Sequence, residues 1–122
     1  MRIQKLKLIK REKRHRRLRS KVKGTPLRPR LSIYRSHKNL YAQIIDDTKN
    51  KTLLSLSTLD KEIKNKFPFA GNIAAAKLLG EILSRSAKEK SIYKVVLDRS
   101  HYLYHGRIKA FAESARQGGL EF

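Results

Sequence analysis

The middle of the chain alternates between apolar and polar positions. In residues 31–35 and 39–46, one face carries the apolar side chains of Leu31, Ile33, Leu40, Ala42 and Ile44. The opposite face carries Ser32, Tyr34, Tyr41 and Gln43. This period of two predicts two strands, and the short polar link at residues 36–38 predicts that they form a β-hairpin. A further run at residues 52–58 follows a polar turn, so the three segments predict an antiparallel meander.

Two later segments have the helical period instead. One stripe within residues 72–90 consists of Ile73, Ala76, Leu79, Ile82 and Leu83, and predicts a helix that packs one side on the sheet. A second stripe, starting near Arg107, consists of Ile108, Phe111, Ala112 and Ala115. It predicts a last helix, which Gly118 and Gly119 should end because glycine readily adopts positive φ.

The apolar run in residues 93–98 lies between these helices. It predicts a strand buried on both faces, and the preceding helix favours a crossover to a central, parallel position in the sheet. The expected fold class is therefore α/β. Its small mixed β-sheet combines an antiparallel three-strand meander with one parallel strand, is flanked by helices, and follows a basic N-terminal arm.

Charge is distributed unevenly along this framework. Thirty Lys and Arg residues against ten Asp and Glu give a net charge of +20, and fourteen of the basic residues but only one acidic residue lie within residues 1–30. So basic a surface indicates a polyanionic partner. Residues 10–17 have no apolar side chain to bury, so we expect this stretch to be unfolded alone and to order against phosphates. A solvated tail is the simpler alternative.

The chain accordingly divides into a basic RNA-binding arm, residues 1–23, and a single α/β RNA-binding domain, residues 24–122. Gly24, Pro26 and Pro29 break any helix between them and predict a hinge. In the arm, the candidate phosphate ligands are Arg14, Arg16, Arg17 and Arg19.

Two absences narrow the function further. The sequence has no cysteine, which removes disulfides, thiolate nucleophiles and cysteine-based zinc sites and is typical of a reducing interior. No apolar run approaches the roughly 18 residues of a spanning helix. We expect an intracellular chain with no membrane partner, no small-molecule substrate and no cofactor.

Residues 98–107, DRSHYLYHGR, form the predicted loop between the last strand and the last helix. Asp98, Ser100 and His101 are residue types of a hydrolytic triad, but neighbours in sequence usually diverge and no GxSxG elbow is present. His101 and His105 have a zinc-binding spacing but lack a third ligand, so no metal site is expected. Alternatively, Tyr102 and Tyr104 simply pack at the edge of the core while the histidines are solvated, an alternative that applies to Tyr102 and Leu103 in particular.

An RNA-binding role uses every polar residue of this loop. Arginine matches phosphate oxygens, tyrosine and histidine rings stack on unpaired bases, and Gly106 permits close approach at a helix N-terminus that favours anions. Similar residues recur at the other predicted strand ends: Arg28, Arg30, Arg35, His37, Lys38 and Tyr41. We therefore favour RNA over catalysis or metal binding.

Several longer stretches also resemble a known family. They read GTPLRPRLSIYRSHKNLYAQIIDD, LSLSTLDKEI, GNIAAAKLLGEIL and VVLDRSHYLYHGRIKAFAESARQGGLEF. From about Gly24 to Phe122 the chain resembles bacterial-type large-subunit ribosomal protein eighteen. The resemblance implies a small mixed sheet flanked by helices, bound to 5S rRNA in the central protuberance. It also implies attachment of 5S rRNA to the large-subunit rRNA, a neighbouring 5S-binding ribosomal protein five, and neither catalysis nor cofactor.

The resemblance also implies RNA contacts at the positions of this sequence that match the family's motifs. They are Arg28, Arg30, Arg35, Ser36, His37, Ser57, Thr58, Arg99, Tyr104, His105, Gly106 and Arg107. Many members have glycine or another small residue at position 101, which weakens His101 as a contact. The expected location is the ribosome, in a bacterial cytoplasm or a plastid stroma.

Two alternatives stay open from the residues. One is a nonspecific nucleic-acid or membrane-surface protein that acts through its arm alone. The other is an RNA-processing hydrolase that uses Asp98, Ser100 or His105, although it would lack the clustered carboxylates of a two-metal site.

Overall fold

A computed structural model describes residues 23–67, 72–100 and 102–122. Apart from Lys23, the predicted arm and its four candidate arginines lie outside the described residues. The elements, in chain order, are β1 (Arg30–Arg35), β2 (Leu40–Asp46), β3 (Lys51–Ser57), α2 (Lys61–Lys66), α3 (Ile73–Glu89), β4 (Val96–Asp98) and α4 (Gly106–Gln117).

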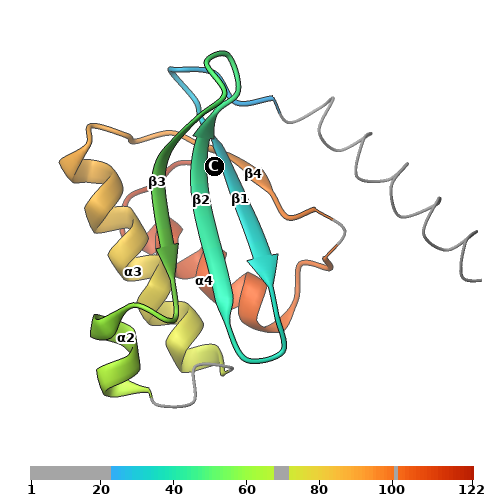
Figure 1. The fold of residues 1–122 in the computed structure, drawn as a ribbon, viewed down its shortest axis with the longest axis vertical. Coiled ribbons are helices and arrows are strands. Elements are labelled where there is room, and N and C mark those ends of the chain that lie inside the picture. The colour runs from blue at the N-terminus through green and yellow to red at the C-terminus, as the bar shows by residue number, and fades with distance from the viewer. Residues whose placement is uncertain (1–22, 68–71, 101) are drawn as a thin grey trace, which may run out of the picture.

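The four strands form one mixed sheet in the order β3-β2-β1-β4. β1 pairs antiparallel with β2, and β2 with β3, whereas β4 runs parallel to β1 with Leu97 beside Leu31. The helices α3 and α4 pack behind the sheet (Figure 1). The predicted α/β class, with its meander and one parallel strand, is therefore confirmed.

The position predicted for the last strand is wrong. β4 covers only Val96–Asp98 and lies at the edge of the sheet, and Val96 and Leu97 are half-buried rather than enclosed on both faces. The reason is that the helices pack on a single face of the sheet (Figure 1). The outer side of the chain just before β4 is instead covered by the C-terminal residues, where Val95 donates its backbone N–H to the Glu121 carbonyl at 3.0 Å.

The core forms where the sequence pattern placed it. The apolar face of the hairpin, made of Leu31, Ile33, Leu40, Ala42 and Ile44, is completely or almost completely buried. The α4 stripe of Ile108, Phe111, Ala112 and Ala115 is fully buried as well. By the alternation of the strands, Ser32, Tyr34, Tyr41 and Gln43 project from the opposite face of the sheet. Among the described elements, no helix lies over that face (Figure 1). One face thus stabilises the fold, and the other stays open.

Local signals fix where the helices begin and end. The Asn72 side chain accepts the Ala75 backbone N–H at 2.8 Å and caps α3. Gly119, at φ 111°, follows the end of α4 in the left-handed conformation expected after a helix. Ile73 departs from the predicted stripe, since it is half exposed in the first turn of α3.

Candidate nucleic-acid interface

The turn between β1 and β2 and the loop after β4 meet at one end of the sheet, and Tyr102 joins them. Its hydroxyl accepts the backbone N–H of Arg35 at 3.2 Å and donates to the Arg35 carbonyl at 3.3 Å. The Arg35 guanidinium lies over the Tyr102 ring, 5.1 Å from its centroid. Tyr102 is buried, which confirms that it packs at the core edge, whereas Leu103 is 77% exposed and does not.

Hydrogen bonds also fix the β1–β2 turn itself. The Ser36 backbone N–H donates to the Asn39 carbonyl at 2.9 Å, and the Asn39 backbone N–H donates to Ser36 Oγ at 3.0 Å. Thr58, which follows β3, also stabilises the turn, because its hydroxyl accepts the Leu40 N–H at 3.0 Å and donates to Asn39 Oδ1 at 3.1 Å. His37 and Lys38 consequently stand exposed at the tip.

This arrangement changes the interpretation of Ser57 and Thr58. Thr58 is fully buried, so its hydroxyl positions the turn and is not available at the surface. Ser57 is half-buried, and its Oγ accepts the Leu59 backbone N–H at 3.0 Å. Thr58 thus acts through the shape of the β1–β2 turn, whereas Ser57 stabilises the turn that follows β3.

Arg107 links the first turn of α4 to the same surface. Its Nη2 donates to the Ser36 carbonyl at 3.0 Å, but its buried Nη1 has no hydrogen-bond partner within the described residues. Burial and the nearby charge of Arg35 lower the pKa of Arg107. No carboxylate within the described residues forms an ion pair with either arginine. An unsatisfied cationic donor next to a second arginine favours an incoming anion.

The N-terminus of α4 lies beside Arg107 and is open. Gly106 adopts a left-handed φ of 56°, and no atom lies within 4 Å of the position that a Cβ would take. His105 occupies the capping position but forms no side-chain cap hydrogen bond. Backbone N–H groups at an uncapped helix start attract anions, so this end of α4 adds to the positive potential of the two arginines.

The remaining predicted loop residues are partly engaged within the protein. Arg99 donates from Nη1 to the Tyr102 carbonyl at 2.9 Å, which holds the loop closed. The Tyr104 hydroxyl accepts Arg116 Nη1 at 3.1 Å, and the half-buried ring lies against the core. His101 lies outside the described residues.

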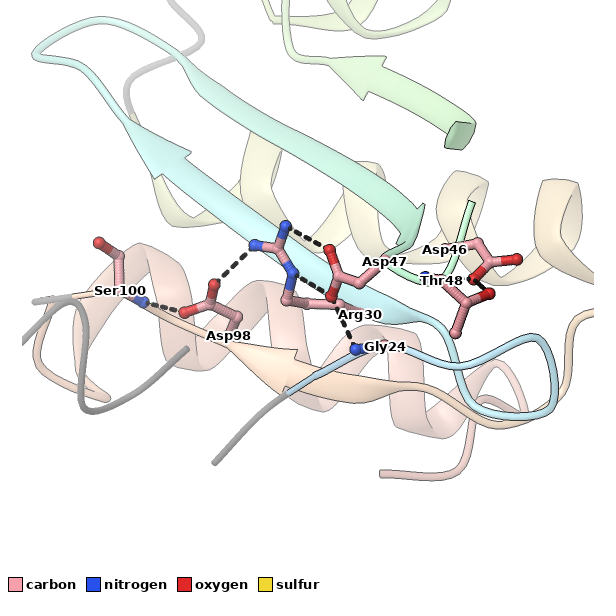
Figure 2. A network of polar contacts seen from close by, with 7 residues as sticks. All are labelled: Gly24, Arg30, Asp46, Asp47, Thr48, Asp98 and Ser100. Atoms are coloured by element: carbon pink, nitrogen blue, oxygen red, sulfur yellow. Dashed lines mark hydrogen bonds and ion pairs between the residues drawn. The ribbon is translucent and has the colours of Figure 1, made fainter. Parts of the chain in front are cut away.

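Arg30 belongs to a different, structural network (Figure 2). Its Nε and Nη2 donate to the two oxygens of Asp47 at 2.9 and 3.1 Å, and its Nη1 donates to Asp98 at 2.9 Å. Only 11% of its side chain and 2% of the Asp98 side chain are exposed. Burial lowers the pKa of Arg30, but the hydrogen bonds and charges of Asp47 and Asp98 outweigh it and raise that pKa overall.

The Arg30 guanidinium therefore already binds two carboxylates, and the RNA contact that its motif suggested stays a prediction. The same network anchors Gly24, the first residue of the predicted domain. The Gly24 backbone N–H donates to Asp47 Oδ2 at 2.7 Å, and its carbonyl accepts the Asp47 N–H at 3.2 Å (Figure 2). The hairpin register could have signalled the pairing, since it puts residue 30 opposite residue 45 and close to Asp47.

Comparison with known proteins shows the family of this chain. The family model described as "Ribosomal L18 of archaea, bacteria, mitoch. and chloroplast" matches residues 5–122. The chain belongs to the ribosomal L18 family. A protein of Pelotomaculum thermopropionicum named "Large ribosomal subunit protein uL18" is 57% identical over 112 residues, 92% of each chain. Proteins of the same name from Thermotoga neapolitana and Sorangium cellulosum are 57% and 50% identical, covering 93% and 96% of this chain and 93% and 98% of their own.

In this L18-family chain, the carboxylate proposed for a hydrolytic triad is engaged within the protein, and His101, the triad's candidate base, lies outside the described residues. The Asp98 oxygens bind Arg30 Nη1 and the Ser100 backbone N–H, the latter at 2.9 Å, so the carboxylate holds the backbone in place (Figure 2). Across the described ranges, no three His, Cys, Asp or Glu side chains are grouped to bind a metal ion. No helix in that part of the chain is long and apolar enough to cross a membrane.

The structure separates the predicted contacts of the L18-family chain into two locations. One group gathers at the C-terminal end of β1: Arg35, Ser36, His37, Lys38, Arg99, His105, Gly106 and Arg107. Arg28 lies at the other end, exposed in a turn closed by its N–H to the Thr25 carbonyl at 3.2 Å. β1 separates them by about 17 Å at about 3.3 Å per residue. A partner that contacts both must follow the full length of the sheet.

Proposed function

We propose that this chain, a large-subunit ribosomal protein of the L18 family, binds 5S rRNA and helps attach it to the large-subunit rRNA in the central protuberance. The contact surface consists of residues 35–38, the loop at residues 99–105 and the first turn of α4. The observation that carries this proposal is the buried Nη1 of Arg107, which has no hydrogen-bond partner in the described part of the chain and lies beside Arg35 at the open start of α4. We name this group the anion notch.

The anion notch would hold a backbone phosphate of the RNA. Nη1 of Arg107 and the first N–H groups of α4 offer donors to phosphate oxygens, and charge-assisted bonds of this kind are strong and directional. Lys38 and His37 at the exposed turn would contact neighbouring phosphates or the ribose 2′-hydroxyls. Because the major groove of A-form RNA is deep and narrow, recognition would depend on shape and unpaired bases.

Further contacts would extend the interface beyond the anion notch. Arg14, Arg16, Arg17 and Arg19 of the arm would neutralise more phosphates, and Arg28 at the far end of the sheet would reach a separate strand of RNA. The neighbouring partner would be ribosomal protein five. We propose no catalytic role and no cofactor, and the bacterial origin of the relatives favours a bacterial cytoplasm over a plastid stroma.

Specific binding to 5S rRNA tests the proposal directly. The full chain should bind a 5S rRNA transcript in a filter-binding assay at least ten-fold more tightly than an unrelated structured RNA of equal length, at one fixed salt concentration. Phosphate neutralisation alone does not depend on sequence, so discrimination requires the shaped surface. Equal affinity for the two RNAs would contradict the proposal.

A variant of the anion notch should weaken this binding. Arg107→Ala removes donors to a phosphate, and hydrogen bonds to charged groups contribute about 1.5–3 kcal/mol, so affinity for 5S rRNA should fall roughly 10- to 150-fold. Arg85→Ala is the matched control, because Arg85 is equally charged but lies exposed on α3, away from the turn. Thermal melting of each variant checks that the fold is kept. A similar loss in both variants would show that only total charge matters.

A further inference from the structure

The face of the sheet that the helices leave open carries two polar and aromatic rows next to the anion notch. In one row, Tyr41 pairs across the strands with Tyr34 on one side and Ser57 on the other. In the next row, Gln43 pairs with Ser32 and Ser55. Among the described elements, the long helices α3 and α4 lie on the opposite side of the sheet (Figure 1).

The two tyrosines are available as a stacking surface. Their ring centroids are 5.7 Å apart with an interplanar angle of 46°, so they lean on one another while Tyr34 remains 60% exposed. Together with Ser32 and Gln43 they line an open depression of about 310 Å³. Burying an aromatic ring normally stabilises a protein, so an exposed Tyr34 beside a half-buried Tyr41 on an open sheet face indicates a surface that is covered in a complex.

The polar groups beside the rings are unused. Neither the Gln43 amide nor the Ser32 hydroxyl has a side-chain hydrogen bond within the described residues. An amide offers both a donor and an acceptor, and a hydroxyl offers the same in a smaller group. Such groups next to an aromatic ring match the edge and the face of a nucleobase.

The charge around this face favours nucleic acid over an acidic or a purely apolar partner. Between Ile33 and Ile45 the only charged residues are Arg35 and Lys38. Tyr34 and Tyr41 are the cross-strand pair of this face nearest to the β1–β2 turn, where His37 and Lys38 are exposed and the Ser36 carbonyl accepts a hydrogen bond from the Arg107 guanidinium, so the tyrosine face borders the turn that leads to the anion notch. RNA bound at the notch and the turn would bring neighbouring nucleotides to the tyrosines.

We propose that this open sheet face binds an unpaired base of the RNA, which stacks on the Tyr34 ring while Gln43 and Ser32 hydrogen-bond to its edge. The inference rests on the proposed function, since it assumes that the anion notch binds 5S rRNA. It adds a base-binding site and two recognition residues, Tyr34 and Gln43. The competing occupant is a segment of a neighbouring protein.

Three tyrosine variants separate the loss of base stacking from the effect of removing any exposed tyrosine. Tyr34→Leu keeps an apolar side chain but removes the aromatic ring, and stacking contributes about 1–3 kcal/mol per base, so affinity for a 5S rRNA transcript should fall roughly 5- to 150-fold. Tyr34→Phe keeps the ring and should bind within about two-fold of the parent chain. Tyr93→Leu is the matched control, because Tyr93 is 56% exposed but lies before β4, at the opposite end of the sheet.

Salt dependence and cross-linking provide readouts that a change in fold would not imitate. The slope of log affinity against log salt should be the same in Tyr34→Leu and the parent chain, because no phosphate contact is lost. Ultraviolet cross-linking of the complex, followed by trypsin digestion, should attach RNA to the peptide of residues 31–35, which contains Tyr34 but not Tyr41.

The outcomes distinguish this inference from the proposed function. If the parent chain binds 5S rRNA specifically but Tyr34→Leu binds equally well and the peptide of residues 31–35 carries no RNA, the open face does not bind a base and a protein partner is favoured. If the parent chain shows no preference for 5S rRNA, the proposed function itself fails. A loss in Tyr34→Leu that Tyr34→Phe does not share, with an unchanged salt slope, supports the base-binding site.

Discussion

Arg30→Met should lower the free energy of unfolding by about 3–5 kcal/mol, because removing one partner of a buried ion pair leaves the other charge uncompensated. Asp98 is 2% exposed and Asp47 22%, so neither carboxylate can recover full hydration after the guanidinium is lost. The same network holds Gly24, the edge strand β4 and the end of β2 together (Figure 2). Urea denaturation monitored by circular dichroism measures the loss.

A second substitution provides the control for Arg30→Met. Adding Asp98→Asn removes the uncompensated charge while leaving an oxygen that can accept the Ser100 N–H, so the double variant should recover part of the stability. The affinity of folded Arg30→Met for 5S rRNA, measured well below its melting temperature, should match that of the parent chain. Unchanged stability together with weaker RNA binding would reverse this assignment and make Arg30 a contact residue.

The affinity for 5S rRNA should fall by about 10³- to 10⁵-fold between 50 and 200 mM salt if the chain neutralises about six to ten phosphates. A net charge of +20 and an arm with four closely spaced candidate arginines provide ample cations for this number. Filter binding across a salt series gives the slope, and a flat response would contradict the phosphate-based mechanism.

Removing the arm measures how much of the salt dependence comes from the arm and how much from the domain. A chain that begins at Lys23 loses the densest part of the positive charge, so its salt slope should be smaller while its preference for 5S rRNA over an unrelated RNA is kept. Phosphate contacts position a protein, and the shaped surface provides discrimination. If a peptide of residues 1–23 accounted for all of the binding and the rest of the chain bound nothing, the arm-only alternative would be correct.

The sequence predicted the fold well wherever a local period decided it. The alternation in the hairpin assigned Leu31 and Ile33 to the core and Tyr34 to the open face, and the structure agrees. The last strand was misplaced because a short apolar run has no period that separates a central strand from an edge strand. Its position depends on where the C-terminal residues and the helices pack, which is a long-range property.

The candidate site was predicted less completely. Composition and motifs identified Arg35, Arg99 and Arg107 as a group, but assigned Arg30 and Thr58 to the same surface. Both are engaged within the protein, because the largely covered Arg30 side chain faces Asp47 and Asp98 while the buried Thr58 faces Asn39. A motif preserves residues that position a contact as well as those that make one, and the letters alone do not distinguish the two.

By itself, then, the sequence determined the charge that selects a polyanion, the alternation that builds the hairpin and the family to which the chain belongs. Net charge is a sum over residues, and the alternation and the family motifs are read from neighbouring positions in the sequence. Only the tertiary structure decided which arginine binds carboxylates and which has a guanidinium nitrogen without a partner among the described residues, because both outcomes depend on segments far apart in sequence. It also decided that the tyrosine face stays open, since both long helices pack on the opposite side of the sheet (Figure 1).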